Sequence, residues 1–449
     1  MRNYKVIDVD AFEADLASVA DTIRAKNGSD ELYEFPTGYQ SAIASLSSVK
    51  EKDVNFYDID GTLLYSYTLD EAQALTELPP SGGYHEGLVF DGWNWELDAV
   101  KALTYPMDIG ALYNTIDGAC WLFLDLTVNE QLTQELHFSQ TVENVVEIDW
   151  GDGSEKETIG GTGLVAMSHT YSALGEYIVK IYASTYKCTL GANSSTTNIF
   201  GNINNYHNRN ILKKLYASNG YFVSQYCFSY CYDLEIANIR FSAANASITT
   251  RCFTDCYNLR CAILANSLYP TQPHAFYRCY NLRTACIGNK SKNTQGSSFY
   301  QCYSLKRRML PETCTMGQGY DVFDCKSLQE SSGTASASAL HNCRDCNSLR
   351  RFYLANGSTG IATSFFENCY SLSEIDIPAT VTTIDANAFA KCYSLLRIRF
   401  NSTTPPTIAN VNAFTGVPTA CVVEVPAGTL EAYQSAENYS VIASQMVEV

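Results

Sequence analysis

The sequence lacks any stretch of about 18 apolar residues, so we expect no helix that spans a membrane. It also lacks the apolar core of a secretory signal, because charged residues interrupt its first ten positions. The signal could have been removed, but a start at Met1 favours synthesis in the cytosol and exit by another route.

Basic residues are scarce: 30 Lys and Arg stand against 47 Asp and Glu, which gives a net charge of −17. The deficit lies in residues 1–210, whereas the charges of residues 211–449 nearly balance. Nucleic-acid binding needs clustered Lys and Arg, so nucleic acid is not an expected partner. The apolar content of 46% predicts packed cores, and a length of 449 residues predicts more than one domain.

Histidines are few, and the six present show no paired ligand spacing and no partner for a nucleophile. The segment 58–62, Asp-Ile-Asp-Gly-Thr, resembles the nucleophile motif of haloacid dehalogenase-type phosphatases. That chemistry needs a parallel sheet that presents a Lys and a further acidic pair, and the following sequence predicts none. We therefore expect no enzyme activity and no cofactor.

Two residue groups could in principle hold a metal. Cys343 and Cys346, with His341 nearby, have the spacing of a zinc half-site, but both cysteines also fill inward positions of a repeat. Asp149 and Asp152 could hold Ca²⁺, but capping of the Trp-Gly-Asp-Gly turn is the favoured role. We expect no metal site.

Cysteine, in contrast, is abundant, with 17 residues, and eight of them recur in a phrase close to Phe-x-x-Cys-Tyr-[Ser/Asn/Asp]-Leu. The recurring positions are Cys231, Cys256, Cys279, Cys302, Cys325, Cys346, Cys369 and Cys392. A period near 23 residues predicts a solenoid, because one such unit cannot bury its own apolar face. The odd and unpaired spacing favours reduced cysteines that act as small core residues.

Within each repeat, the residues three and five positions after the Leu are mostly apolar, which predicts a strand with one face inward. The Phe and Cys are three apart, so one helical turn could aim both at the core. The fifth repeat carries Val322, Ser331 and Gly333 in these columns, and we expect it to be the weakest coil.

Two outward stripes are candidate receptor contacts. The aromatic stripe comprises Tyr232, Tyr257, Tyr280, Tyr303, Tyr370 and Tyr393, and it could bind a glycan or protein or simply cover the coil edges. The basic stripe includes Arg260, Arg283, Lys306, Arg307, Arg350 and Arg351, and it could meet an anionic polymer such as teichoic acid or form a solvated face.

The repeats resemble the cysteine-containing leucine-rich repeats of bacterial surface antigens, most clearly at Phe366–Leu372 with Ile375–Pro378. Residues 404–449 resemble the C-terminal capping unit of that family. The resemblance implies a solenoid over residues 221–403, preceded by a linker and cap at 187–220, and a role in adhesion or recognition.

The front half is expected to contain three smaller units. Residues 1–48 predict a helical segment and resemble the N-terminus of tail-associated phage proteins, which implies attachment to a virion. Residues 50–115 predict a small β-rich connector with a hairpin turn at Asp60-Gly61. Residues 116–186, with Trp150-Gly-Asp-Gly and His169-x-Tyr171, resemble the PKD-type immunoglobulin-like β-sandwich, which is mostly a spacer.

The resulting hypothesis is a multidomain, non-enzymatic phage tail fibre or virion surface protein, made in the host cytoplasm. Its solenoid would bind a host cell-surface glycan or protein, and its N-terminus would bind other tail proteins. Tail fibres are usually trimers, so this hypothesis allows a homotrimer. The alternative is a bacterial surface adhesin of the leucine-rich-repeat type.

Overall fold

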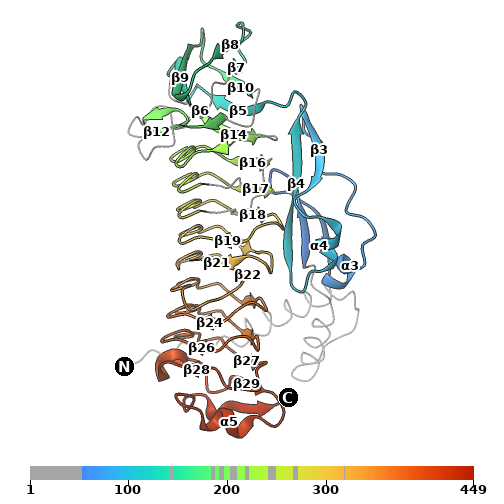
Figure 1. Ribbon diagram of the computed structural model, residues 1–449, viewed down its shortest axis with the longest axis vertical. Helices are drawn as coiled ribbons and strands as arrows, with labels where there is room; N and C mark the ends of the chain where they lie inside the picture. Colours follow the sequence, from blue (N-terminus) through green and yellow to red (C-terminus); the bar gives the residue numbers. More distant parts are fainter. Residues whose placement is uncertain are drawn as a thin grey trace, which may run out of the picture. The chain divides into compact units, whose positions relative to one another are not determined.

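The computed structural model describes residues 53–449 except 129, 141–144, 184–187, 192–196, 203–209, 218–221, 241–248, 266–271 and 318. The helical segment expected at residues 1–48 lies outside the described residues. Residues 54–449 form one compact unit, which Figure 1 shows with a β-sandwich at one end and helix α5 at the other. In this part of the chain, no helix is long and apolar enough to cross a membrane.

The connector, residues 54–115, contains one four-stranded sheet in the order β2-β1-β4-β3 and two short helices. Strands β1 and β2 form the predicted hairpin, and β4 lies parallel to β1. The elements are β1 (Val54–Tyr57), β2 (Leu63–Tyr67), α3 (Leu69–Gln73), β3 (Leu88–Trp93), α4 (Leu97–Lys101) and β4 (Met107–Thr115).

The next segment folds as two facing sheets, with Trp150, Tyr171 and Phe138 buried between them. One sheet contains β5 (Cys120–Asp125), β7 (Val146–Asp149), β8 (Glu157–Ile159) and β10 (Glu176–Ala183). The other contains β6 (Thr133–Gln140), β9 (Gly163–Thr170), β11 (Cys188–Leu190) and β15 (Phe222–Val223). The two-layer β arrangement agrees with the sequence prediction, whereas the PKD assignment stays a prediction.

Strand β14 (Leu212–Ala217) joins the sandwich to the solenoid within one continuous sheet. It pairs antiparallel with β5 and parallel with β16, the first repeat strand. The segment 187–220 was expected to be a linker and cap. It contributes β11 to one sheet of the sandwich and β14 to the sheet that continues into the solenoid. It also forms a separate short hairpin, β12 (Thr197–Asn198) and β13 (Gly201–Asn202).

The solenoid stacks parallel strands, one per coil. They are β16 (Ile236–Arg240), β17 (Cys261–Ala265), β18 (Thr284–Ile287), β20 (Arg307–Arg308), β22 (Glu330–Gly333), β23 (Arg351–Leu354), β25 (Glu374–Ile377), β27 (Arg397–Phe400), β29 (Val422–Val425) and β30 (Met446–Glu448). A second set of short strands comprises β19 (Asn293–Thr294), β21 (Thr315–Met316), β24 (Gly360–Ile361), β26 (Thr383–Ile384) and β28 (Thr407–Ile408). The turns η2 (Val411–Phe414) and η3 (Ala443–Gln445) and helix α5 (Leu430–Ser435) lie in the last coils.

The repeated Phe and Cys residues point into the solenoid, as predicted. Phe253, Phe276 and Phe299 are fully buried and stack with ring centroids 5.2–5.3 Å apart. Each repeated thiol from the second repeat onward donates a hydrogen bond to a backbone carbonyl of the preceding coil, as Cys279 Sγ does to Phe253 O at 3.1 Å. The same carbonyl also accepts from a backbone N–H of its own coil, as Phe253 O does from Cys256 N at 3.2 Å, so the thiol adds a second donor that links successive coils.

The segment between Phe and Cys is not the helical turn we predicted. The residue before each repeated Cys adopts a left-handed conformation, with φ between 58° and 65°, although none is glycine. This conformation costs roughly 1–2 kcal/mol per residue. It lets the backbone N–H donate to the next coil, as Asp255 N does to Tyr277 O at 2.8 Å. Coils are thus hydrogen-bonded along this edge as well as along the strands.

The degenerate fifth coil encloses a buried ion pair. Arg308 is fully buried, lies 3.2 Å from Asp321 and donates to Ser332 O at 2.6 Å. Its long side chain fills the interior beside Ser331 and Gly333, which leave room where other repeats carry apolar side chains. A buried pair is weak evidence for stability, because desolvation offsets the attraction.

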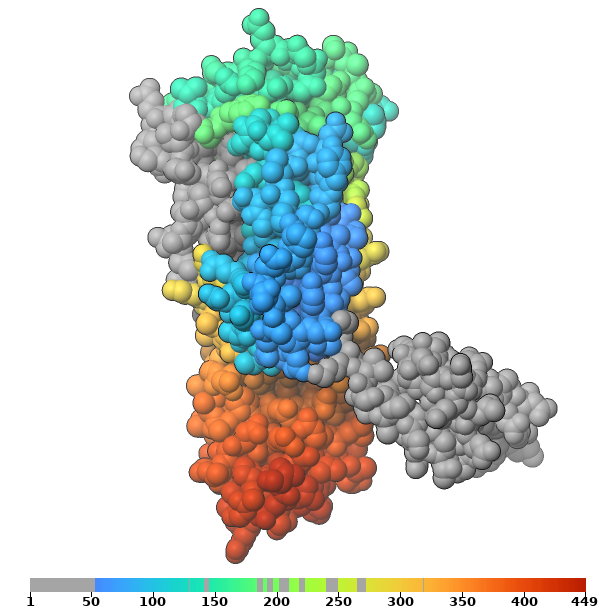
Figure 2. All heavy atoms as spheres, turned by 90° about the vertical axis from the view of Figure 1, so that its right-hand side faces the viewer, coloured from blue at the N-terminus to red at the C-terminus, as the bar shows by residue number. Residues whose placement is uncertain are grey.

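The connector packs along the outward face of the first repeat strands. Figure 2 shows it lying over the coils in the middle of the unit and leaving the C-terminal coils uncovered. Trp95 Nε1 donates to Ile287 O at 2.8 Å, and Asn94 Nδ2 donates to Leu264 O at 3.2 Å. An added Cβ on Gly110 would lie 2.6 Å from Ile263 Cγ2, so the strands approach closely. The connector is therefore docked on the repeats.

Candidate functional site

The outward face of the repeat strands, here called the strand face, is divided into two chemically different halves. In the first coils it carries buried apolar side chains that contact the connector: Ile236, Cys261, Ile263, Cys286 and Met309. In the last coils the same columns carry charged side chains: Arg351, Glu374, Asp376, Arg397 and Arg399. Among the described residues, the connector leaves the second half of this face uncovered, so a partner can reach it there.

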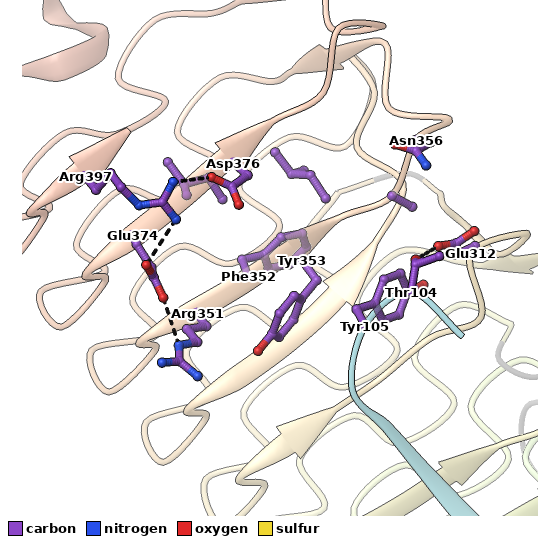
Figure 3. Close-up of a pocket in the computed structure, with 13 residues that line it drawn as sticks. Thr104, Tyr105, Glu312, Arg351, Phe352, Tyr353, Asn356, Glu374, Asp376 and Arg397 are labelled. Carbon is purple, nitrogen blue, oxygen red and sulfur yellow. Dashed lines mark hydrogen bonds and ion pairs between the residues drawn. The ribbon is translucent and has the colours of Figure 1, made fainter. Parts of the chain in front are cut away.

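A pocket of about 300 Å³ lies where the connector ends and the open half begins (Figure 3). Tyr105 of the connector stacks against Tyr353 of β23, with ring centroids 5.9 Å apart. The hydroxyl of Tyr105 donates to Leu310 O at 2.6 Å, which fixes the ring. Thr104 donates to the Glu312 carboxylate, and burial raises the pKa of Glu312. The pocket therefore offers an aromatic wall beside carboxylates.

The opposite wall of this pocket is a chain of ion pairs. Arg351 Nε lies 3.0 Å from Glu374, whose other oxygen lies 3.1 Å from Arg397. Arg397 also contacts Asp376 at 2.6 Å, as the dashed lines in Figure 3 show. Arg399 continues the chain to Glu424 at 2.5 Å. The open half is consequently charged but locally neutralised.

The predicted basic stripe separates into paired and unpaired members. Arg260 lies 2.7 Å from Glu235, and Arg307 lies near Asp108 and Glu330. In the described part of the chain, no acidic side chain forms an ion pair with Arg283, Lys306 or Arg350. The stripe is thus not a uniform basic face.

The predicted aromatic stripe is present as two stacks. The first comprises Tyr232, Tyr257, Tyr280 and Tyr303, with ring centroids 4.9–5.0 Å apart. The second pairs Tyr370 with Tyr393 at 5.7 Å. Each inner ring has both faces covered by its neighbours, so a sugar ring could meet only ring edges and hydroxyls. This geometry favours the role of covering the coil edges.

A third aromatic stack, formed by Tyr277, Tyr300 and Phe323, was not predicted from the sequence. Its ring centroids lie 4.9 and 5.0 Å apart. Tyr277 and Tyr300 each directly follow the Phe of their repeat, and Phe323 follows Val322, which stands in the Phe column of the fifth repeat. The repeat period alone could therefore have revealed the stack.

Asp58, the first residue of the phosphatase-like motif, is buried with both carboxylate oxygens engaged. One oxygen accepts from Ile59 N at 2.8 Å and from the Tyr113 hydroxyl at 2.9 Å. The other accepts from Gly83 N at 3.1 Å and lies 3.0 Å from His85 Nε2. Asp58 therefore ties the hairpin to the loop that precedes β3.

The metal candidates have structural contacts of their own. Asp149 accepts from Gly151 N at 2.9 Å and Asp152 accepts from Ser154 N at 3.0 Å, which are the turn caps expected there. Cys343 and Cys346 are fully buried in the repeat core. Across the described ranges, no cluster of three metal-ligating side chains occurs.

The repeats match a known family. Residues 221–343 and 341–435 match the model described as the BspA type leucine rich repeat region, in six copies. The resemblance inferred from the repeats is thereby confirmed for this part of the chain. The match extends to neither residues 1–48 nor 116–186, so it supports neither the phage-tail nor the PKD resemblance. A search among curated proteins found no match.

Three of the solved structures that are similar to this chain share 18% sequence identity with it. A leucine-rich repeat protein from Bacteroides ovatus matches over 52% of this chain and 82% of its own, with a TM-score of 0.24. A leucine rich repeat protein from T. pallidum covers 40% and 81%, with a TM-score of 0.27. A leucine rich cell surface protein from Faecalibacterium prausnitzii covers 50% and 72%, with a TM-score of 0.26.

Proposed function

Residues 221–435 are a BspA-type leucine-rich-repeat region, and on this premise we propose that the protein is a bacterial surface recognition protein of the adhesin type. Its solenoid binds a glycan or protein on another cell through the open half of the strand face. The single observation that carries this proposal is the pocket lined by the stacked rings of Tyr105 and Tyr353, at the edge where the connector stops covering the repeats.

The chemistry of this pocket suits recognition. Aromatic rings supply large contact area at low entropic cost, and Asn356 and the ion-paired carboxylates supply hydrogen-bonding groups around them. Neutralised charges discriminate between partners without attracting every polyelectrolyte. We propose binding without catalysis, since Asp58 is held by four neighbours and is not free to act as a nucleophile.

A virion protein that binds a host cell is the second candidate. It is favoured by the tail-protein resemblance of residues 1–48, where contacts with other tail proteins and trimer formation would be sought. Because those residues lie outside the described ones, we place the bacterial-surface proposal first. Adjacent tail or capsid genes would reverse this order.

Binding of the purified full chain to intact cells and to an array of host glycans and matrix proteins tests the proposal. We expect Tyr353→Ala to weaken binding about tenfold, because aromatic anchors typically carry more than 1 kcal/mol of binding energy. Tyr393→Ala is the matched control, since Tyr393 is 56% exposed and lies outside the pocket. Equal binding by both variants and the unmodified protein would rule out this pocket as the contact.

A further inference from the structure

A second hollow, of about 500 Å³, opens beside the opposite edge of the connector. Tyr57 and Asp108 line it from β1 and β4, and residues at or just before the repeat strands line it from the solenoid. Among the latter are Arg283, Lys306 and Arg307. Three predicted members of the basic stripe are thus gathered in one concave site.

Arg283 and Lys306 occupy equivalent positions in successive coils, each directly after the repeated Leu. The column continues with Gln329, whose backbone N–H donates to Lys306 O at 2.8 Å. Neighbouring parallel strands lie about 4.8 Å apart, so the two cationic side chains project from adjacent rungs.

Within the part of the chain that the structure describes, these two cations differ from their neighbours in their ion pairs. Arg307 is occupied by Asp108 at 3.5 Å and Glu330 at 3.3 Å. Arg260 holds the same column position one coil earlier, where it pairs with Glu235 at 2.7 Å. Within the described residues, Arg283 and Lys306 form no ion pair, and both are exposed. Two adjacent like charges repel each other, and an anion between them would relieve that repulsion.

The other walls carry groups that suit a hydroxylated ligand. Ser304, Ser327 and Gln329 present hydroxyl and amide groups to the hollow. Burial and the nearby Asp108 raise the pKa of Tyr57, so its phenol remains a hydrogen-bond donor at neutral pH. Arg matches carboxylate and phosphate oxygens with two parallel hydrogen bonds, whereas Lys acts as a point charge.

We propose that this Arg283–Lys306 hollow binds the anionic group, a carboxylate or a phosphate, of a polymer rich in hydroxyl groups. Arg283 holds the anion, Lys306 neutralises it, and the hydroxyl and amide groups of the hollow contact the hydroxyl groups of the polymer. This second site lies beyond the proposed function, and neither depends on the other.

Calorimetric titration of the full chain tests the proposal with three probes. A glucuronate-containing tetrasaccharide carries carboxylates, a glycerol phosphate oligomer carries phosphates, and chitotetraose is the neutral control. We expect the charged probes to bind, and Arg283→Gln combined with Lys306→Gln to lower affinity about tenfold or more, as expected for lost charged hydrogen bonds. The matched control Arg260→Gln, in the same column but already paired, should stay within about twofold.

The outcomes separate the sources of the anion. Binding of the glucuronate probe alone identifies a uronate polymer, and binding of the glycerol phosphate probe alone identifies a phosphate polymer. The proposal is overturned if neither charged probe binds, if chitotetraose binds equally well, or if the double variant binds like the unmodified protein. Unchanged circular dichroism of the exposed-residue variants establishes that they fold.

Discussion

The contact between connector and solenoid makes a sharp prediction at Gly110 of β4. A Cβ added there would lie 2.6 Å from Ile263 Cγ2 and 2.9 Å from Cys286 Cβ. Both distances are too short, and both contacts lie in strands that cannot move without disturbing the stacked coils. Overpacking of this kind costs typically 1–3 kcal/mol, so we expect Gly110→Ala to weaken docking by about that amount.

Fluorescence reports this contact directly. Trp95 is 4% exposed and hydrogen-bonded to the solenoid, and all four tryptophans lie in the connector or the sandwich. In a denaturant titration, Gly110→Ala should shift the tryptophan transition to lower denaturant before the repeats unfold by circular dichroism. The matched control is Gly175→Ala, whose added Cβ would meet only ordinary contacts at 3.5 Å.

A double variant identifies the cause. Ile263→Ala removes two of the three side-chain atoms nearest to the added Cβ, namely Cγ2 at 2.6 Å and Cδ1 at 3.0 Å, so in the Gly110→Ala background it should cost less than it does alone. Contacting residues show interaction energies of about 0.5–3 kcal/mol, and we expect a coupling in that range. Strict additivity of the two changes, or an unshifted transition in Gly110→Ala, would refute the docked arrangement.

Three further predictions concern the cores. Phe299→Ala should lower the free energy of unfolding by about 3–5 kcal/mol in a denaturant melt, because the ring is fully buried. The control is Tyr84→Ala, since Tyr84 is 91% exposed and its loss should cost under about 1 kcal/mol. An equally small cost for Phe299→Ala would contradict the inward position of its ring. Thiol titration should count about 17 reactive groups after denaturation but few in the native protein. The reason is that the thiolate is the reactive form and burial raises the pKa of the repeated thiols. Rapid reaction of most thiols in the native protein would contradict their burial. Burial raises the pKa of Asp152, but hydrogen bonds from Ser154 and His169 outweigh it and lower the pKa to about 2. The ionised Asp152 should therefore stabilise the sandwich fully above pH ~4, and this stabilisation should be lost as the pH falls towards 2. Melts followed by tryptophan emission should lose this pH dependence in Asp152→Asn, and an identical profile in both proteins would refute it.

The periodic features were predictable from the sequence because one repeat dictates the environment of the next. The inward columns, the Cys column and the Tyr stack all follow from a period near 23 residues. The thiol hydrogen bonds and left-handed turns were not predictable, since side-chain period does not reveal backbone conformation. The helical turn inferred from the Phe–Cys spacing was wrong for this reason.

Docking of the connector was missed because its contacts join residues more than 150 positions apart, such as Asn94 and Leu264. A signal was nevertheless present. In a solvated strand, outward positions are polar, yet Ile263 and Cys286 stand in an outward column. Apolar residues on both faces of a repeat strand indicate that something covers the outer face, and here it is the connector.

The ion pairs of the open half were also encoded in the period. Arg307, Glu330, Arg351, Glu374 and Arg397 occupy one column and alternate in sign from coil to coil. Opposite charges on adjacent rungs pair with each other, so a count of basic residues alone overstated the basic character of this face. Alternation fails one column away, where Arg283 and Lys306 follow each other.

This difference gives the two candidate sites opposite responses to salt. Around Tyr353 the charges are neutralised by neighbours, so binding there depends on ring contact and hydrogen bonds and should change little with ionic strength. Arg283 and Lys306 are exposed and form no ion pair with another described residue. Binding of an anion there should weaken steeply as salt rises, because screening acts over about 8 Å at 0.15 M. A partner whose binding is salt-resistant therefore engages the Tyr353 pocket, and one released by salt engages the Arg283–Lys306 hollow.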